Sequence, residues 1–213
     1  NNYYKNCYVD LKESCLRSET TVKVFDQMRK LQSYTDEGSP GRDWNVATGM
    51  VIEGKAGFQI MGDWAKGEFT AAGKVPGVDY YCAATPSNNG YLYNVDSFIF
   101  YKSSDPDKQA GQKLLAKLMM GKNFQKVFNL YKGSIPARLD VSMDEFDKCA
   151  KTSNADIKTA GAKGGLVPSF AHGMAQGNTM KAALQDIITE HFNSDMSSVD
   201  AANALADSVL ANM

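Results

Sequence analysis

Both tryptophans of the chain stand at the start of an expected helix rather than in the middle of one. Trp44 follows Asp43 and Trp64 follows Asp63, and each aspartate is a residue type that caps a helix N-terminus. An indole plane packs well against the apolar C–H face of a sugar ring, whereas sugar hydroxyls favour charged or bidentate polar partners. This placement therefore indicates that the indoles stack against a sugar ring. The alternative interpretation is that they only pack at the helix start.

Polar residues at the ends of other expected elements suit the same chemistry. Asp96 interrupts a strand expected over residues 95–101, so its charge must be exposed, paired or functional. Lys132 ends a helix, where it contacts a ligand or only complements the helix dipole. His172 lies among small residues in a glycine-rich loop, which frees its ring for neutral hydrogen bonding. His191, in contrast, lies on the inward or rim face of a helix and is expected to pack in the core or at the surface.

Motifs of catalysis and metal binding are missing. The chain has no G-x-S-x-G elbow, no Walker loop, no G-x-G-x-x-G after a strand and no H-E-x-x-H. Its four cysteines form no C-x-x-C pair and it has two histidines, so a structural zinc site is not expected. We therefore expect a protein that is not an enzyme and that needs no metal and no cofactor.

The composition excludes other classes. Hydrophobic residues make up 43% and charged residues 22%, as in ordinary globular proteins. With 23 basic and 24 acidic residues, the formal charge of −1 gives no electrostatic argument for nucleic acid or an anionic membrane. No apolar run approaches the ~20 residues of a membrane helix. The chain begins without Met or an apolar signal region, so we expect a processed or truncated product.

Hydrophobic spacing, caps and breakers predict an α/β arrangement. Helices are expected over residues 18–35, 43–54, 64–72, 105–118, 123–131, 142–150, 178–191 and 197–209. Strands are expected over 56–61, 80–84 and 95–101. The helix at 142–150 depends on a capping-box signal, Ser142 with Glu145. A loop is expected from Gly161 to Pro168.

A set of short motifs carries a family resemblance. They are GRDWN at 41–45, EGKAG at 53–57, MGDWAKG at 61–67, NVDSF at 94–98, YKGSIPAR at 131–138 and AHG at 171–173. With them the chain resembles the solute-binding proteins of bacterial ABC sugar importers, and most of all their glucose/mannose-binding branch. The resemblance runs from about Thr20 to the C-terminus.

The resemblance implies an α/β fold of the type II periplasmic-binding-protein kind, in which two lobes close over the ligand about a hinge. Residues 1–95 would form the first part of the C-terminal lobe, and 139–213 its helical remainder. Residues 96–138 would be a hinge and crossover segment that belongs to the N-terminal lobe. Most of the N-terminal lobe would be absent from this chain.

The implied function is to bind a monosaccharide, glucose or mannose, and to deliver it to the membrane permease of an ABC importer. The family's sugar contacts fall on Trp44, Trp64, Asp96, Lys132 and His172. The implied protein is a periplasmic monomer, secreted through a signal peptide that is not part of this chain. It binds no nucleic acid and does not insert into the membrane.

The resemblance also bears on the cysteines. An oxidising periplasm would permit a disulfide between Cys82 and Cys149, positions where related proteins carry cysteines. Cys7 and Cys15 could pair locally or remain free. Two other functions stay open: a glycan-active enzyme, which would need two carboxylates beside the sugar, and an interaction domain with a degenerate cleft. Asp96 as the one matched carboxylate speaks against the first, and retention of all five contact types against the second.

Overall fold

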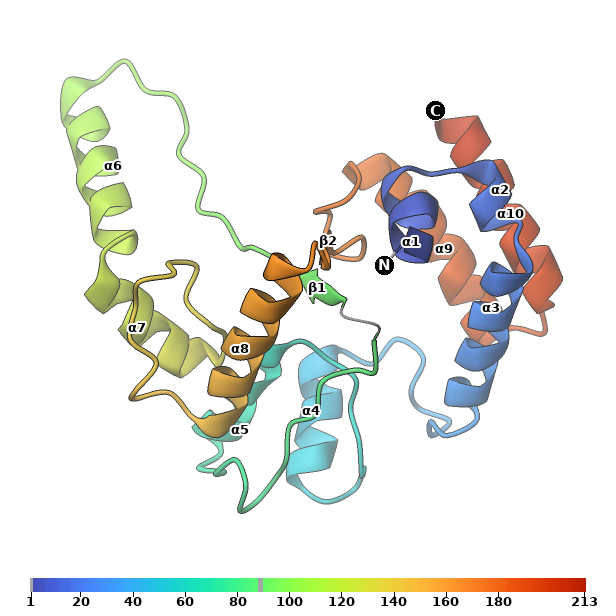
Figure 1. Cartoon of the computed structure of the whole chain (residues 1–213), viewed down its shortest axis with the longest axis horizontal. Coiled ribbons are helices and arrows are strands. Elements are labelled where there is room, and N and C mark those ends of the chain that lie inside the picture. Colours follow the sequence, from blue (N-terminus) through green and yellow to red (C-terminus); the bar gives the residue numbers. More distant parts are fainter. Residues whose placement is uncertain (1, 88–89) are drawn as a thin grey trace. The chain divides into compact units, whose positions relative to one another are not determined.

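The computed structural model describes residues 2–87 and 90–213, which divide into two compact units (Figure 1). The first unit comprises Asn1–Gly41, Ser87–Asn94 and Ala160–Met213. The second unit comprises Arg42–Pro86 and Val95–Thr159. Within the described residues, no helix is both long and apolar enough to cross a membrane.

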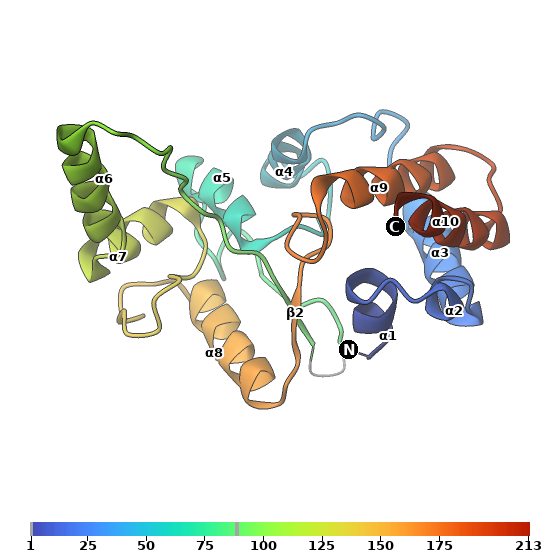
Figure 2. The ribbon, with the colours of Figure 1, turned by 90° about the horizontal axis from the view of Figure 1, so that it is seen from above.

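The first unit is built around three packed helices. They are α3 (Glu19–Gln32), α9 (Asn178–Asn193) and α10 (Ser198–Asn212), which lie side by side in Figures 1 and 2. Ser18 and Ser197 cap α3 and α10, because their hydroxyls accept from the N–H groups of Thr21 and Asp200. Several alanines of α10 allow close contact between the helices. The apolar core that they share contains Leu16, Phe25, Phe170, Met180, Leu184, Ala201, Ala202, Leu205, Ala206 and Val209.

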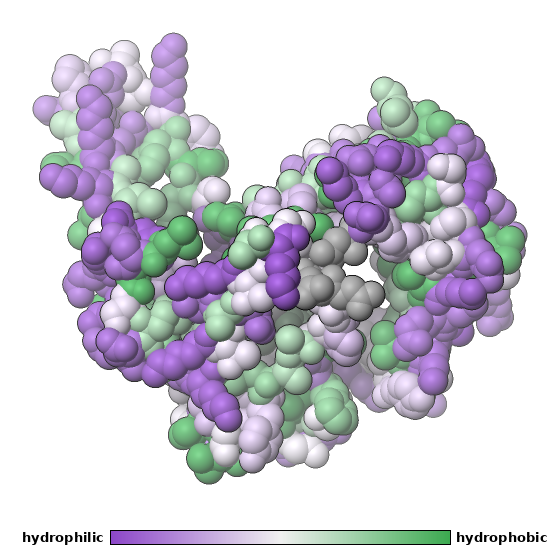
Figure 3. All heavy atoms as spheres, in the orientation of Figure 1, coloured by the Kyte–Doolittle hydropathy of each residue, from purple (hydrophilic) through white to green (hydrophobic). Residues whose placement is uncertain are grey.

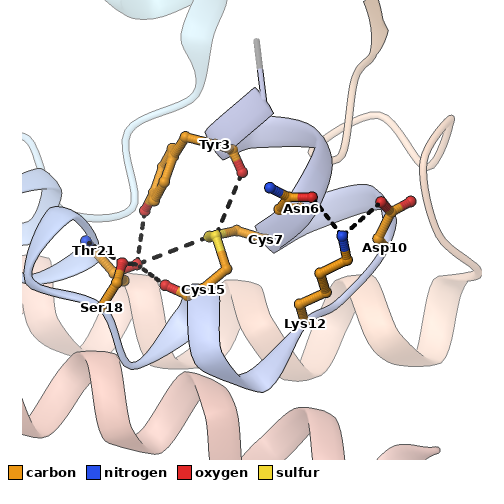
Figure 4. Close-up of a disulfide and its surroundings, with 8 residues drawn as sticks. All are labelled: Tyr3, Asn6, Cys7, Asp10, Lys12, Cys15, Ser18 and Thr21. Atoms are coloured by element: carbon orange, nitrogen blue, oxygen red, sulfur yellow. Dashed lines mark hydrogen bonds and ion pairs between the residues drawn. A yellow bond between two sulfur atoms is a disulfide. The ribbon is translucent and has the colours of Figure 1, made fainter.

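Short N-terminal elements cover this core: α1 (Asn2–Tyr4), a π-helical turn at Lys5–Val9 and α2 (Glu13–Leu16). A disulfide joins Cys7 to Cys15, which decides the question that the sequence left open (Figure 4). Thr21 binds this segment to α3, because its hydroxyl donates to the Cys15 carbonyl at 2.8 Å and accepts from the Tyr3 hydroxyl at 2.9 Å. The N-terminal segment is therefore an integral part of the first unit.

Two short strands pair in parallel within the first unit. Strand β1 (Tyr91–Tyr93) lies beside β2 (Leu166–Pro168), with Tyr91 opposite Leu166 and Tyr93 opposite Pro168. The Ser169 N–H donates to the Tyr93 carbonyl at 2.8 Å and so extends the pairing by one residue. This pairing sets the position of the loop that follows β2.

The second unit is mostly helical. It contains α4 (Trp44–Ile52), a 3₁₀ turn at Asp63–Ala65, α5 (Lys66–Ala71), α6 (Pro106–Met119), α7 (Lys122–Lys132) and the part of α8 (Lys148–Ala162) up to Thr159. Asp105 caps α6, since its carboxylate accepts from the N–H groups of Asp107 and Lys108, and Pro106 occupies the first turn. The second disulfide, between Cys82 and Cys149, also lies in this unit.

The strands expected at 56–61, 80–84 and 95–101 do not form. Across residues 2–87 and 90–213, the two-stranded sheet of β1 and β2 is the one sheet present. A strand is held by ladder hydrogen bonds and cross-strand side chains. Among the described residues, these three segments form no ladder, and the pairing found in them is the isolated bridge between Tyr80 and Pro76. Their apolar side chains lie open as a result; Phe58 is 96% exposed and Ile99 75%.

The helix expected at 142–150 begins later than predicted. Ser142 forms a local turn with Asp144 instead of capping a helix. Helix α8 starts at Lys148, and the Asp147 carboxylate accepts from the Ala150 N–H at 2.8 Å, the bond that an N-cap makes. The helix then continues through Gly161, where the sequence predicted a loop, because helical hydrogen bonding tolerates a glycine near its C-terminus. Pro168 belongs to strand β2.

Candidate functional site

The G-D-W-x-K-G segment (62–67) and the K-G-S-x-P segment (132–136) lie directly against each other in the second unit. A Cβ added to Gly133 would lie 2.7 Å from the Gly67 nitrogen, and one added to Gly67 would lie 2.9 Å from the Lys132 carbonyl oxygen. Gly133 also has a φ of +89°, which ends α7 in the left-handed region. The glycines of both motifs are therefore needed for packing, and this packing places the Trp64 segment beside Lys132.

Asp63 links the same two segments. Its carboxylate lies near the Ser134 side chain and the Ile135 backbone, and polar interactions with both favour the charged form. Burial raises the pKa of Asp63, although these interactions and the nearby Lys66 and Lys132 act in the opposite direction. The sequence predicted a helix cap here; the residue at the cap position is Gly62, with no side-chain capping bond. Asp63 thus holds the two motifs together.

Trp64 is packed on the backbone of its own motif. A Cβ on Gly62 would lie 2.2 Å from carbon atoms of the indole, so the ring covers the glycine directly. The side chain is half-buried. Contact with the glycine on one face limits the freedom of the indole, as a stacking platform requires.

Lys132 and Asp96 form an ion pair, so the structure brings together two of the predicted polar residues. The Lys132 ammonium also lies 5.7 Å from the centre of the Phe128 ring, a cation–π distance. The Asp96 side chain remains 61% exposed and that of Lys132 27%. Side by side, an ammonium that donates and a carboxylate that accepts can both bind one hydroxyl group.

Trp44 begins α4 and is 40% exposed. Asp43 precedes the helix as predicted, but its side chain makes no capping hydrogen bond. Instead, the Trp44 carbonyl accepts from the Gln59 amide at 2.9 Å, and the Thr48 hydroxyl donates to the Gln59 oxygen at 2.8 Å. The sequence analysis missed Gln59, which attaches the extended segment 56–61 to the first turn of α4.

His172 belongs to the first unit, in the loop after β2, and is exposed. Its Nδ1 lies 2.7 Å from the Ser169 hydroxyl. Tyr4 holds the same loop, since its hydroxyl donates to the Pro168 carbonyl at 3.0 Å and accepts from the Phe170 N–H at 2.7 Å. Burial raises the pKa of Tyr4. The sequence analysis missed Ser169 and Tyr4; only the spacing of Ser169, three residues before the histidine, offered a signal.

His191 is fully buried, in keeping with the packing role predicted for it. Its ring centre lies 4.7 Å from that of Phe25. Burial, followed by the charge of Arg29, lowers the pKa of His191. Its Nδ1 has no hydrogen-bond partner among the described residues. Within the same residues, no cluster of three or more histidine, cysteine or acidic side chains could hold a metal ion.

An apolar hollow lies along the exposed side of α7, in the second unit. It has a volume of about 540 Å³ and is lined by Phe124, Val127, Phe128, Tyr131 and Lys132. The rings of Phe124 and Phe128 are stacked, with centroids 5.4 Å apart. The hollow therefore adjoins Lys132 with a surface that is almost entirely hydrocarbon.

Comparison with known proteins places the chain in a family. Residues 7–183 match the family model of the bacterial extracellular solute-binding proteins. The chain is 46% identical over 209 residues to a probable sugar-binding periplasmic protein of Brucella suis biovar 1, covering 98% of this chain and 49% of that protein. Identity to a probable sugar-binding periplasmic protein of Rhizobium meliloti is 43% over 210 residues, covering 98% and 50%.

A more distant relative is an uncharacterized ABC transporter extracellular-binding protein of Pyrococcus horikoshii. It is 34% identical over 172 residues, which covers 80% of this chain and 38% of that protein. The chain spans about half the length of the Brucella and Rhizobium relatives. The family match over most of the chain and the identity to these relatives show that the chain belongs to the bacterial extracellular solute-binding protein family.

Proposed function

We propose that the chain comprises the C-terminal lobe of a periplasmic sugar-binding protein together with a crossover segment of its N-terminal lobe. This protein binds a monosaccharide, glucose or mannose, between two lobes and delivers it to the permease of an ABC importer. The observation that carries the proposal is the contact between segments 62–67 and 132–136, which joins the Trp64 platform to the Lys132–Asp96 pair. The printed names of the Brucella and Rhizobium relatives, probable sugar-binding periplasmic proteins, support it.

The proposed chemistry divides the sugar into two surfaces. The Trp64 indole covers the C–H face, and removal of water from both apolar surfaces favours the contact. Lys132 and Asp96 bind the hydroxyls at the edge of the ring, where one hydroxyl accepts from the ammonium and donates to the carboxylate. Charge-assisted hydrogen bonds of this kind are stronger than those between neutral groups, and they depend on the direction in which the hydroxyl points.

Trp44 and His172 are proposed as further sugar contacts on the strength of the family resemblance. Both side chains are exposed, so neither is needed to fill the core of its unit. An exposed indole and a neutral imidazole add a second apolar surface and a directional hydrogen bond, respectively.

For the domain organisation we propose that residues 96–138 belong to an N-terminal lobe, whereas 1–95 and 139–213 form the C-terminal lobe. Helices α6 and α7 carry apolar residues at their surface (Figure 3). Leu114 is 69% exposed, and the hollow on α7 is apolar. An exposed apolar surface of this kind is typical of a region that is covered by another domain or protein. The relatives are about twice as long, so their additional half supplies a candidate cover.

The two other functions that the sequence left open have less support. A glycan-active enzyme would need a second carboxylate across the sugar from Asp96. Asp63, the carboxylate of the G-D-W-x-K-G motif, lies beside Ser134, Ile135 and Lys132 in the contact between the two motifs. The family is one of solute-binding proteins, which favours capture of a ligand over its conversion.

Calorimetry on the full-length protein that contains this chain tests the proposal, with D-glucose, D-mannose and D-galactose as probes. We expect glucose or mannose to bind, and Trp64→Ala to weaken binding by about two orders of magnitude, the scale of a central aromatic contact. Tyr34→Ala removes an aromatic ring that is more exposed than Trp64, at 74%, and should leave the affinity unchanged. Binding of none of the three sugars, or wild-type affinity in Trp64→Ala, would overturn the proposal.

A further inference from the structure

Ser169 is a buried polar residue next to the proposed ligand residue His172. Ser169 is only 2% exposed, and its hydroxyl oxygen is 2.7 Å from His172 Nδ1. The backbone around it is anchored on both sides: its N–H donates to the Tyr93 carbonyl, and its carbonyl accepts from the Met174 N–H at 2.9 Å. These two bonds fix the backbone of Ser169, so the position of its hydroxyl beside the imidazole is restricted.

The direction of this hydrogen bond follows from the needs of the hydroxyl. A serine hydroxyl carries one hydrogen, and a buried donor without an acceptor is unfavourable. Among the described residues, the Ser169 hydroxyl contacts His172 Nδ1 alone, so a bond donated by Nδ1–H would leave the hydroxyl hydrogen without an acceptor there. If the hydroxyl donates to Nδ1 instead, its donor is satisfied. The neutral ring then carries its proton on Nε2.

We infer that Ser169 is the positioning residue of His172: its hydroxyl binds Nδ1, holds the ring in place and keeps the proton on Nε2. The ligand atom that meets Nε2 must then be a hydrogen-bond acceptor, such as a sugar hydroxyl or ring oxygen. The part of this inference that concerns the ligand rests on the proposed function. The assignment of the tautomer rests on the geometry alone.

Tyr4, in helix α1, also restricts the backbone around Ser169. Its hydroxyl bonds the Pro168 carbonyl and the Phe170 N–H, the residues on either side of Ser169. Two hydrogen bonds to one phenol hold this stretch of backbone at a fixed distance from α1. The serine is thereby kept at the position from which it reaches the imidazole, which is how a supporting residue orients a ligand-binding histidine.

Nitrogen-15 NMR of the full-length protein, labelled at histidine and free of sugar, tests the assignment. The His172 signals are identified by their loss in His172→Gln. In the wild type we expect Nδ1 to give the signal of an unprotonated nitrogen that accepts a hydrogen bond. Ser169→Ala should move that signal toward the position of an imidazole averaged between tautomers, and Ser169→Thr, which retains the hydroxyl, should restore it.

Ser198→Ala is the matched control, because the Ser198 hydroxyl lies 3.5 Å from Nε2 of the other histidine, His191. This variant should leave the His172 signals in place. A wild-type spectrum with the proton on Nδ1 would overturn the assignment. So would unchanged His172 signals in Ser169→Ala.

Titration of the same variants with D-glucose separates this inference from the proposed function. We expect Ser169→Ala to bind glucose roughly three- to tenfold more weakly, the scale of one neutral hydrogen bond, and Ser169→Thr to bind more tightly than Ser169→Ala. Wild-type affinity in Ser169→Ala would overturn the role of Nε2 in ligand binding. If the spectra change as expected but even the wild type binds none of the hexoses, the proposed function fails and the tautomer assignment stands.

Discussion

The backbone of Gly133 lies against that of Gly67 so closely that a methyl group on either residue would overlap the other segment. Because one glycine ends α7 and the other lies in the first turn of α5, this contact fixes the end of one helix against the start of another. The residues that flank the contact are Lys132 and Lys66. Lys132 is proposed to bind the ligand, and Lys66 forms a partly buried ion pair with Asp147.

Gly133→Ala should therefore destabilise the protein more than a positive φ alone would. We expect a loss of about 3 kcal/mol in the free energy of unfolding, from the clash added to the strained backbone. Gly77→Ala is the control: Gly77 has a similar φ of +86° but nothing within 4 Å of an added Cβ, so it should cost about 1 kcal/mol. Urea unfolding measures both. Equal losses would show that close approach is not the reason for the glycine.

The ion pair between Lys66 and Asp147 offers a second test. The Lys66 side chain is 7% exposed and its Nζ lies 2.7 Å from the carboxylate. Lys66→Met leaves a partly buried carboxylate without its partner and should lower the free energy of unfolding by about 3 kcal/mol. Lys126→Met breaks a pair with Glu145 of the same length but greater exposure and should cost less than about 1 kcal/mol. Similar thermal shifts for both variants would contradict the importance of burial.

The buried hydroxyl of Tyr80 should make the stability of the protein depend on pH in the alkaline range. Its hydroxyl is buried without a partner among the described residues, and burial, with the nearby Asp147, raises its pKa to about 12. Because the ordinary pKa is 10.0, the contribution of the neutral phenol to stability is present below pH 10 and is lost as the pH rises toward 12. Tyr80→Phe keeps the ring stacked on Phe69 and should gain about 1 kcal/mol at neutral pH.

Between pH 10 and 12 the wild type should accordingly lose stability more steeply than Tyr80→Phe. Denaturation at a series of pH values measures the difference. Tyr81→Phe, at a neighbouring tyrosine that is 84% exposed, should follow the wild type. Parallel curves for Tyr80→Phe and the wild type would contradict the assignment.

The disulfide between Cys82 and Cys149 is expected in protein taken from an oxidising compartment. The two residues are 67 positions apart, and closure of a loop of that length stabilises by roughly 4 kcal/mol in the chain-entropy model. The Cys7–Cys15 loop, with a separation of 8, should contribute less, about 2.5 kcal/mol. Peptide mapping without reductant identifies the pairs. Free thiols at Cys82 and Cys149 in native protein would contradict the prediction.

Hydrogen exchange tests the proposed lobe assignment. If residues 97–136 need the other half of the longer protein to cover them, their amides should exchange quickly in the 213-residue chain and slowly in the full-length protein. Helix α10, whose inner face is fully buried within the first unit, should be equally protected in both. Slow exchange over 97–136 in the 213-residue chain would count against the assignment.

The sequence by itself determined the features that depend on neighbouring residues. The caps at Ser18, Asp105 and Ser197 were predictable because each bonds an N–H two or three positions later. The family was also within reach, because short motifs carried it. The loop bond between Ser169 and His172 is equally local, and a serine three residues before a histidine in a turn could have indicated it.

The tertiary structure decided what depends on residues far apart in the chain. The strands expected at 56–61, 80–84 and 95–101 have a suitable composition, but a strand forms only where a partner offers its hydrogen bonds. Asp63 has the sequence context of a helix cap, yet it lies beside Ser134 because two glycines let their segments meet. Tyr4 reaches the loop of His172 from the opposite end of the chain. Such contacts depend on how the chain packs in space, and no local pattern encodes them.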